Sequence, residues 1–235
     1  MSEAFNELFD RHAAYAMDGQ QEMERISVDQ PWEADIDGGS LTVGNFTTRI
    51  QVLASYSQVS GTLLWAWARR RELGEGWPEH TTLASKHIAT LGKDAPEFSA
   101  GIAKLSEDEA DDAVLIGVAL LDAAGRTAVG VDAPAFYRGD HAQGSIYLLI
   151  DSAKLRPIRE ENLASYVMDR FVTYVKMGMP FTSAQRAFEH YARAHKLRVE
   201  ATGTTVLATD DDEGVVTAEF DTTGKLTGIS CESNC

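Results

Sequence analysis

The chain has only two cysteines among its 235 residues, and both stand near its end, at Cys231 and Cys235. Two cysteines in a chain of this length exclude a disulfide framework, and a reducing cytosol would keep both as thiols. Their Cys-x-x-x-Cys spacing differs from the Cys-x-x-Cys of thioredoxin-type sites. With no further cysteine in the chain, a four-thiolate zinc site is excluded as well.

The sequence also lacks long apolar runs. No stretch of about 18 apolar residues is present, so a membrane-spanning helix is not expected. The first residues have neither the basic start nor the apolar stretch of a signal peptide. We therefore expect a cytoplasmic protein with no membrane partner.

Positive charge is scarce, because 21 Lys and Arg stand against 36 Asp and Glu, which gives a net charge of -15. Such a surface repels phosphate backbones and anionic lipids, so nucleic acid is not expected as a partner. An acidic surface instead steers association with a cationic one, which favours a basic protein partner. The alternative interpretation is that the acidity only keeps the protein in solution.

Familiar catalytic motifs are missing too. The chain contains no Gly-x-Ser-x-Gly, no phosphate-binding Gly-x-x-x-x-Gly-Lys and no Gly-x-Gly-x-x-Gly. His190 and His195 are five apart on a predicted helix, so they point in different directions and do not chelate one ion. The sequence therefore favours a non-catalytic protein without a cofactor, and leaves an enzyme as the less favoured possibility.

What the chain does contain predicts an α+β fold, with antiparallel sheets packed against helices. Apolar residues at helical spacing predict a helix over residues 3–26. Alternating patterns predict a hairpin around Asp37-Gly38-Gly39 and an antiparallel pair over 48–57 and 62–68. Ser106 and Glu109 form a capping box for a following helix, and 129–131 and 145–150 are predicted strands.

The second part of the chain has a different pattern. Residues 154–159 are typical of a connection, two helices are predicted over 160–177 and 182–196, and short β-prone runs follow up to residue 230. We therefore predict an α+β domain over 1–152, a helix pair with an antiparallel meander packed on it over 160–230, and an exposed cysteine tail over 231–235.

The stretch Gly61-Thr-Leu-Leu-Trp-Ala-Trp-Ala68 resembles the Gly-Thr-Trp-Leu-Trp-Ala-Trp-Ala-Asn strand of an uncharacterised bacterial domain-of-unknown-function family. A leucine replaces the first tryptophan here, and Arg69 replaces the asparagine. Pro31-Trp32, the hairpin and Gln51–Ser57 extend the resemblance over roughly the first 150 residues. The resemblance supports the fold prediction and implies no activity and no catalytic residue.

Two groups of residues are candidates for a binding surface. Trp65 and Trp67 are spaced by two on a predicted strand, so they would share one face. One interpretation is an aromatic platform with Arg69 beside it, and the other is that both tryptophans are core residues. Tyr137, Arg138 and His141 lie close together in a predicted polar loop, where an anion clamp with a general base is one interpretation and an ordinary hairpin loop is the other.

The cysteine tail is the remaining candidate site. Cys231 and Cys235 would serve in redox exchange, in capture of a soft metal ion such as Cu(I), or as the substrate of a tail-modifying enzyme. The other interpretation is that these two free thiols have no function. Two functions are therefore in play. The first is an acidic, non-catalytic interaction protein, for instance an antidote or partner of a basic protein, and the second is a protein whose work is done at this tail.

Overall fold

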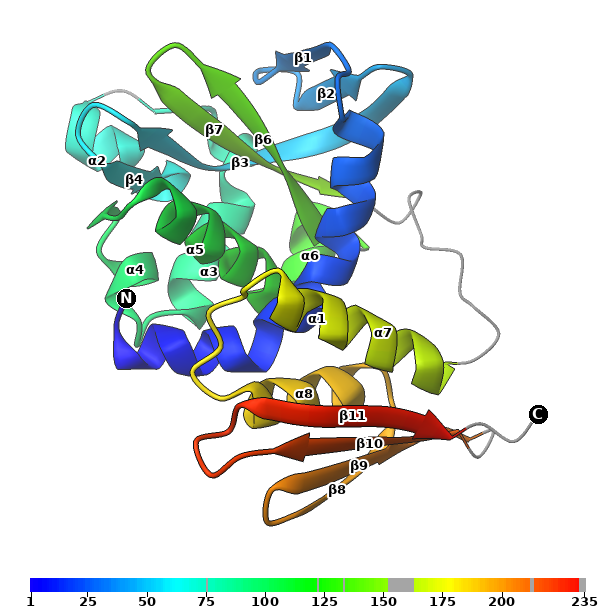
Figure 1. The fold of residues 1–235 in the computed structure, drawn as a ribbon. Coiled ribbons are helices and arrows are strands. Elements are labelled where there is room, and N and C mark those ends of the chain that lie inside the picture. Colours follow the sequence, from blue (N-terminus) through cyan, green and yellow to red (C-terminus); the bar gives the residue numbers. More distant parts are fainter. Residues whose placement is uncertain (75, 122, 133, 152–162, 212–213, 233–235) are drawn as a thin grey trace. The chain divides into compact units, whose positions relative to one another are not determined.

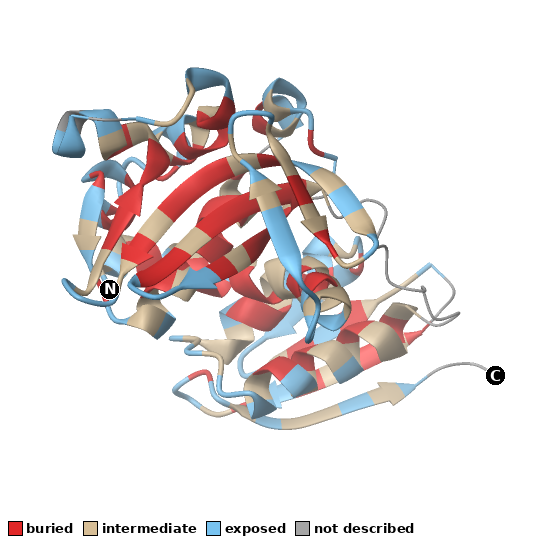
Figure 2. Ribbon diagram, turned by 90° about the horizontal axis from the view of Figure 1, so that it is seen from above, coloured by how far each residue is buried: buried red, intermediate tan, exposed pale blue. Residues whose placement is uncertain are grey.

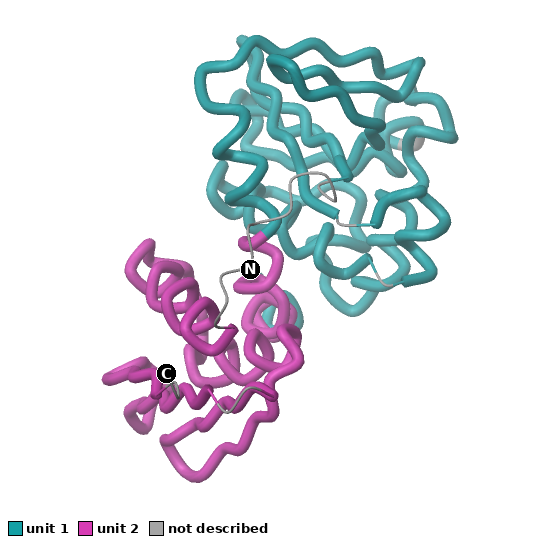
Figure 3. Tube along the Cα trace, turned by 90° about the vertical axis from the view of Figure 1, so that its right-hand side faces the viewer, with its two compact units in different colours: residues 1–5, 19–156 teal, residues 6–18, 157–235 magenta. Residues whose placement is uncertain are grey.

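A computed structural model describes residues 1–74, 76–121, 123–132, 134–151, 163–211 and 214–232 (Figure 1). Contacts divide the chain into two compact units (Figure 3). Unit 1 holds Met1–Phe5 and Gly19–Arg156, and unit 2 holds Asn6–Asp18 and Pro157–Cys235. Both units combine helices with antiparallel strands, and a helix pair and a meander form the C-terminal part. The predicted α+β class is therefore confirmed.

The first helix, α1, spans Glu3–Ser27, and Ser2 caps it by accepting a hydrogen bond from the backbone N–H of Phe5. The sequence assigned this whole helix to the first domain. The structure instead divides it between the units, because Ala14 packs in the core of unit 2 whereas Met23 packs in a core of unit 1. A helical stripe shows which side of a helix is buried but not which other segment buries it.

Unit 1 is built on a seven-stranded antiparallel sheet. Its order is β1-β2-β3-β4-β5, and β7 also pairs with β3 and with β6. The long strand β3 joins the two parts of the sheet, and its pairing with β7 shifts register between Val52 and Ala54. The strands are β1 (Trp32–Asp35), β2 (Ser40–Val43), β3 (Phe46–Ser57), β4 (Thr62–Trp65), β5 (Ile102–Lys104), β6 (Pro134–His141) and β7 (Gly144–Asp151).

The middle of this sheet is buried (Figure 2). Met23 of α1 belongs to one core, and the helices α3 (Leu83–Leu91) and α5 (Glu107–Leu120) pack against strands of the sheet. Gly117 lets α5 pack closely against the indole ring of Trp65, because a Cβ at this position would lie 3.0 Å from Trp65 Cη2. The unit is completed by α2 (Arg69–Leu73), α4 (Pro96–Ser99), α6 (Ala123–Val129) and the 3-10 turns Ala66–Ala68 and Glu79–Thr81.

Three predictions within unit 1 were wrong. The strand predicted over 62–68 ends at Trp65. Of the strand predicted over 129–131, Val129 ends α6 and the two residues after it form no strand. The segment taken for a polar loop is β6, a full partner of β7. Pro134 stands at its first residue, where an edge strand tolerates proline, and Gly139 leaves room for the indole of Trp32.

Unit 2 packs two helices on a four-stranded meander (Figure 1). The helices are α7 (Leu163–Lys176) and α8 (Ala184–Ala194), and the sheet order is β11-β10-β9-β8. Aromatic rings fill the space between the layers, with Phe188 of α8 6.3 Å from Phe220 of β10 between ring centroids. The strands are β8 (Arg198–Thr202), β9 (Thr205–Thr209), β10 (Val215–Phe220) and β11 (Leu226–Glu232).

The start of α8 depends on a residue far away in the sequence. The N-cap is Ser183, whose side chain accepts from the N–H of Arg186. The backbone N–H of Thr182 donates to Asp10 Oδ1 at 2.8 Å, and the N–H of Ser183 donates to Asp10 Oδ2 at 3.1 Å. Asp10 is 2 % exposed, so a buried carboxylate from α1 holds the N-terminus of α8.

Candidate functional site

The predicted aromatic platform does not form. Trp65 ends β4, is fully buried, and donates its indole N–H to the carbonyl oxygen of Glu97 at 2.6 Å. Trp67 lies half-buried in the following 3-10 turn, so it does not continue the alternation of the strand. Arg69 stacks on a different ring, 4.4 Å from the centroid of Trp77. Trp65 is therefore a core residue, which was the other interpretation of the pair.

The predicted polar cluster is divided between the two faces of β6. Tyr137 is buried and packs against Trp32, with 5.6 Å between the ring centroids. Arg138, the next residue, points to the opposite face, as alternate residues of a strand do. His141 ends β6 and accepts a hydrogen bond at Nδ1 from the N–H of Gln143 at 3.3 Å. The three residues predicted to form one site therefore do not converge.

Arg138 is the centre of an ion-pair network that joins α5 to the sheet. Its guanidinium contacts Glu107, Asp111 at 2.7 Å and Asp140 at 2.8 Å. The hydroxyl of Tyr147 donates to Asp111 at 2.6 Å. Burial opposes the charge of Arg138, but the carboxylates raise its pKa above the ordinary value. Since three carboxylates already occupy its donors, Arg138 positions α5 instead of presenting an anion clamp.

The beginning of α5 carries the densest negative charge of unit 1. Ser106 and Glu109 form the predicted capping box. Burial, followed by the charges of Asp111, Asp108 and Glu109, raises the pKa of Asp112 to about 6. Asp112 is half-buried. The first two turns of α5 therefore hold several carboxylates close to one another, and only some of these carboxylates are paired with a cation.

A second polar network lies inside unit 2, and sequence inspection missed it. Asp18 is 8 % exposed and accepts hydrogen bonds from the hydroxyls of Tyr174 and Tyr191. His195 Nε2 lies 2.8 Å from Asp18 Oδ2, and the His195 ring is 4.7 Å from the ring of Tyr191. Burial, followed by the Asp18 charge, raises the pKa of both tyrosines above the ordinary value.

The Asp18 network ties α1, α7 and α8 together. A carboxylate beside an imidazole fixes the orientation of the ring, which is also how a general base is held in enzymes. Here both oxygens of Asp18 are occupied by donors of the same unit, so the network stabilises the packing of the helices. Asp18 and His195 are 177 positions apart, and no short motif links them.

The structure places Cys231 within β11, opposite Val216 of β10, and not in a tail that begins at residue 231. Its side chain is half-buried against the core of unit 2, because it faces the helices, and Sγ lies 3.6 Å from the hydroxyl of Ser165. Cys235 falls outside the described residues.

Within the described part of the chain, no three His, Cys, Asp or Glu side chains are grouped as metal ligands. In that same part, no helix is both long and apolar enough to cross a membrane.

Comparison with family models identifies a family for this chain. The model of a family of unknown function (DUF6882) matches residues 6–153. This range agrees with the resemblance over the first 150 residues. Neither the curated proteins nor the solved structures contain a match to the chain.

Proposed function

The chain belongs to this family of unknown function, and we propose that it is a non-catalytic cytoplasmic protein that binds a basic protein partner through the carboxylates of α5. Asp108 is exposed and Asp112 is half-buried one helical turn later. Like charges at this spacing repel one another, so the free protein keeps an unfavourable interaction that a cationic side chain would relieve.

The raised pKa of Asp112 is the observation that carries this proposal. Burial and the neighbouring carboxylates raise it to about 6. Glu107 and Asp111 are occupied by Arg138, and Glu109 is occupied by the capping box. Asp108 and Asp112 are the carboxylates left to receive a lysine or arginine of the partner.

The overall charge supports the same proposal. A net charge of -15 raises the rate at which a cationic protein meets this surface, most strongly at low salt. Steering alone does not select one partner, because any basic protein is attracted. Selection would come from the half-buried carboxylate, whose contact with a cation is less screened by salt than a contact at an exposed position.

The test compares two variants that remove the same charge. The test variant carries Asp108→Asn and Asp112→Asn, and the control carries Asp94→Asn and Asp132→Asn, both at exposed positions of unit 1. A partner is first captured from the protein's own cells at low salt and purified, and its binding is then followed by stopped-flow at several salt concentrations.

We expect the test variant to dissociate about tenfold faster, because a partly buried charge pair has been removed, and the control to dissociate at the wild-type rate. Wild-type affinity should fall as the pH decreases from 7 to 5, because the partner's cation favours ionised Asp112 and protonation of Asp112 opposes it. Equal weakening of both variants would show that only the net charge matters, and the absence of a captured partner would overturn the proposal.

The alternative function, at the cysteine tail, stays a prediction. Cys231→Ser and Cys235→Ser remove each thiol separately. This is a cleaner test than deleting residues 231–235, because Cys231 and Glu232 belong to β11. Partner binding that survives both changes would favour the acidic surface, and binding that either change abolishes would favour the tail.

A further inference from the structure

Unit 2 carries a concentration of cationic and imidazole side chains, although the chain as a whole is strongly acidic. Arg186, His190 and Arg193 are spaced i, i+4 and i+7 on α8, so they form one stripe along the helix. Arg11 and His12 stand on α1. These five residues define a cationic cluster, which the acidic surface of unit 1 does not explain.

The buried carboxylate of Asp10 brings the two helices together at this cluster. Arg186 Nη2 lies 2.8 Å from Asp10 Oδ2, so the α1 turn that contains Arg11 and His12 lies beside the stripe on α8. The charge of Arg11 acts on both His12 and His190. Further along α1, Asp18 lies 2.8 Å from His195 at the end of α8, so His12 and His190 both belong to the stretch where these two helices run side by side.

The cations of the cluster differ in whether they already have a partner. Arg186 is paired with Asp10, and Arg193 is paired with Glu189 at 3.1 Å. Arg11 is exposed and makes no ion pair with any residue in the described ranges. Its planar group presents several N–H donors that suit an oxyanion.

Burial shifts both histidines toward their neutral forms, and neither ring is hydrogen-bonded to a described residue. Burial lowers the pKa of His12 to about 4, and the charges of Arg11 and His190 contribute. Burial also lowers the pKa of His190, with contributions from Arg11, Arg193 and Arg186, while Glu189 acts in the opposite direction. His12 is half-buried, so its ring remains accessible to a ligand at the surface of the cluster.

We propose that Arg11, His12 and His190 form a binding site for a small phosphate-bearing molecule. A neutral imidazole still carries one N–H donor, so two imidazoles and one guanidinium would surround a tetrahedral oxyanion from three directions. The site is separate from the α5 carboxylates and does not depend on the function proposed for them. A long polyanion does not fit, because the net charge of -15 repels a nucleic acid backbone.

Binding should be linked to protonation of the histidines. A bound dianion beside His12 and His190 favours their charged forms, so their pKa should rise on binding and the affinity should increase as the pH falls. The other charged groups that face them are Asp10 on α1 and Arg186, Glu189 and Arg193 on α8. Asp10 and Glu189 are held in ion pairs.

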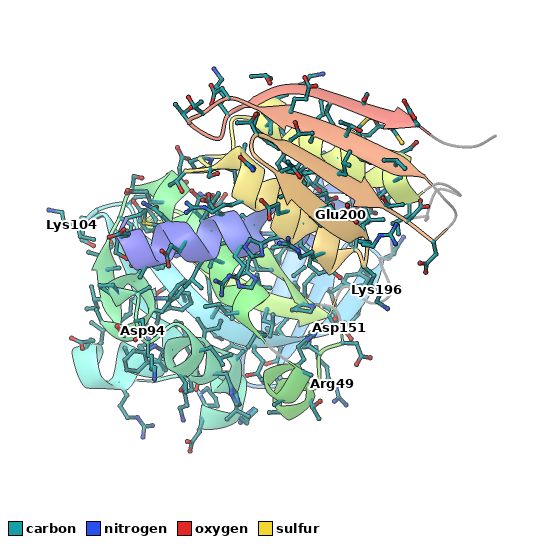
Figure 4. All side chains as sticks on the ribbon, turned by 90° about the horizontal axis from the view of Figure 1, so that it is seen from below. Arg49, Asp94, Lys104, Asp151, Lys196 and Glu200 are labelled. Carbon is teal, nitrogen blue, oxygen red and sulfur yellow. The ribbon has the colours of Figure 1, made fainter. Side chains whose placement is uncertain are left out.

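The experiment is a titration of the full chain with inorganic phosphate, followed by NMR of the histidine ring protons. Sodium chloride at matched ionic strength reports screening alone. Sodium sulfate is the probe for pH dependence, since sulfate keeps its charge between pH 8 and pH 4 whereas phosphate does not. Arg11→Gln removes the free guanidinium at an exposed position. Arg49→Gln removes an exposed arginine of β3 in unit 1 and is the matched control (Figure 4).

We expect saturable shifts of the His12 and His190 signals with phosphate, loss of at least about tenfold in affinity in Arg11→Gln, and wild-type binding in Arg49→Gln. Sulfate should bind roughly tenfold more tightly at pH 5 than at pH 7. The proposal would be overturned by equal shifts with sodium chloride, or by wild-type phosphate affinity in Arg11→Gln.

Discussion

Replacement of Asp10 by asparagine should release the N-terminus of α8. The Asp10 carboxylate accepts from the N–H of Thr182 at 2.8 Å, from the N–H of Ser183 at 3.1 Å and from Arg186 at 2.8 Å. Arg186 and the Thr182 hydroxyl are exposed enough to bind water instead. Asparagine keeps one acceptor oxygen, so one of the two backbone N–H groups loses its bond to a charged acceptor, at about 2 kcal/mol. The other bond becomes a neutral one, at about 1 kcal/mol, which gives about 3 kcal/mol in all.

Native-state hydrogen exchange measures this effect locally. A loss of about 3 kcal/mol corresponds to exchange that is roughly 100-fold faster at the amides of Thr182 and Ser183. Asparagine has nearly the same shape as aspartate, so no cavity is added. Glu7→Gln, at an exposed position of the same helix, is the control and should leave both rates unchanged. Wild-type rates in the Asp10 variant, or equal acceleration by both changes, would refute the assignment.

Three further predictions follow from single residues. Asp112→Asn should stabilise the protein at pH 7, because a pKa raised to about 6 means that ionisation opposes folding; the full shift would correspond to about 3 kcal/mol, which partial exposure reduces to about 1 kcal/mol. The gain should appear in urea unfolding as the pH rises from 4 to 6 and should be absent at pH 4, and an equal gain at both pH values would contradict it. Gly117→Ala should destabilise the protein by about 1 kcal/mol in the same assay, because the new Cβ would lie 3.0 Å from Trp65. This cost should exceed the gain from the better helix propensity of alanine, and increased stability would show that the ring can move. In a Cys235→Ser variant, Cys231 should react with a thiol reagent at least about tenfold more slowly in the native protein than in urea, since the thiol is half-buried, and equal rates would show that the end of β11 opens readily.

Local features of the sequence were sufficient for much of the fold. The capping box of Ser106 and Glu109, the turn after Asp35 and the helical stripe that begins near Glu3 were all predicted and are present. Such signals depend on residues within one or two turns of one another, so a single segment contains the information. The family was likewise recognisable from short stretches such as Gly61–Ala68, and its model matches residues 6–153.

Contacts between distant residues decided the rest. The sequence of β6 lacks the alternating pattern of a strand because Pro134 and Gly139 interrupt it. Gly139 leaves room for the ring of Trp32, a contact that only the folded chain shows. The spacing of Trp65 and Trp67 is the same for a platform and for a core, and the approach of Gly117 buries Trp65.

The candidate sites depend even more on tertiary structure. Arg11, His12 and His190 are ordinary residues on two helices until Asp10, 176 positions from Arg186, brings those helices together. The sequence by itself determined the composition, the charge, the local caps and turns and the family. The tertiary structure decided which charges have partners, because burial and pairing across long sequence separations leave no periodic pattern in the chain.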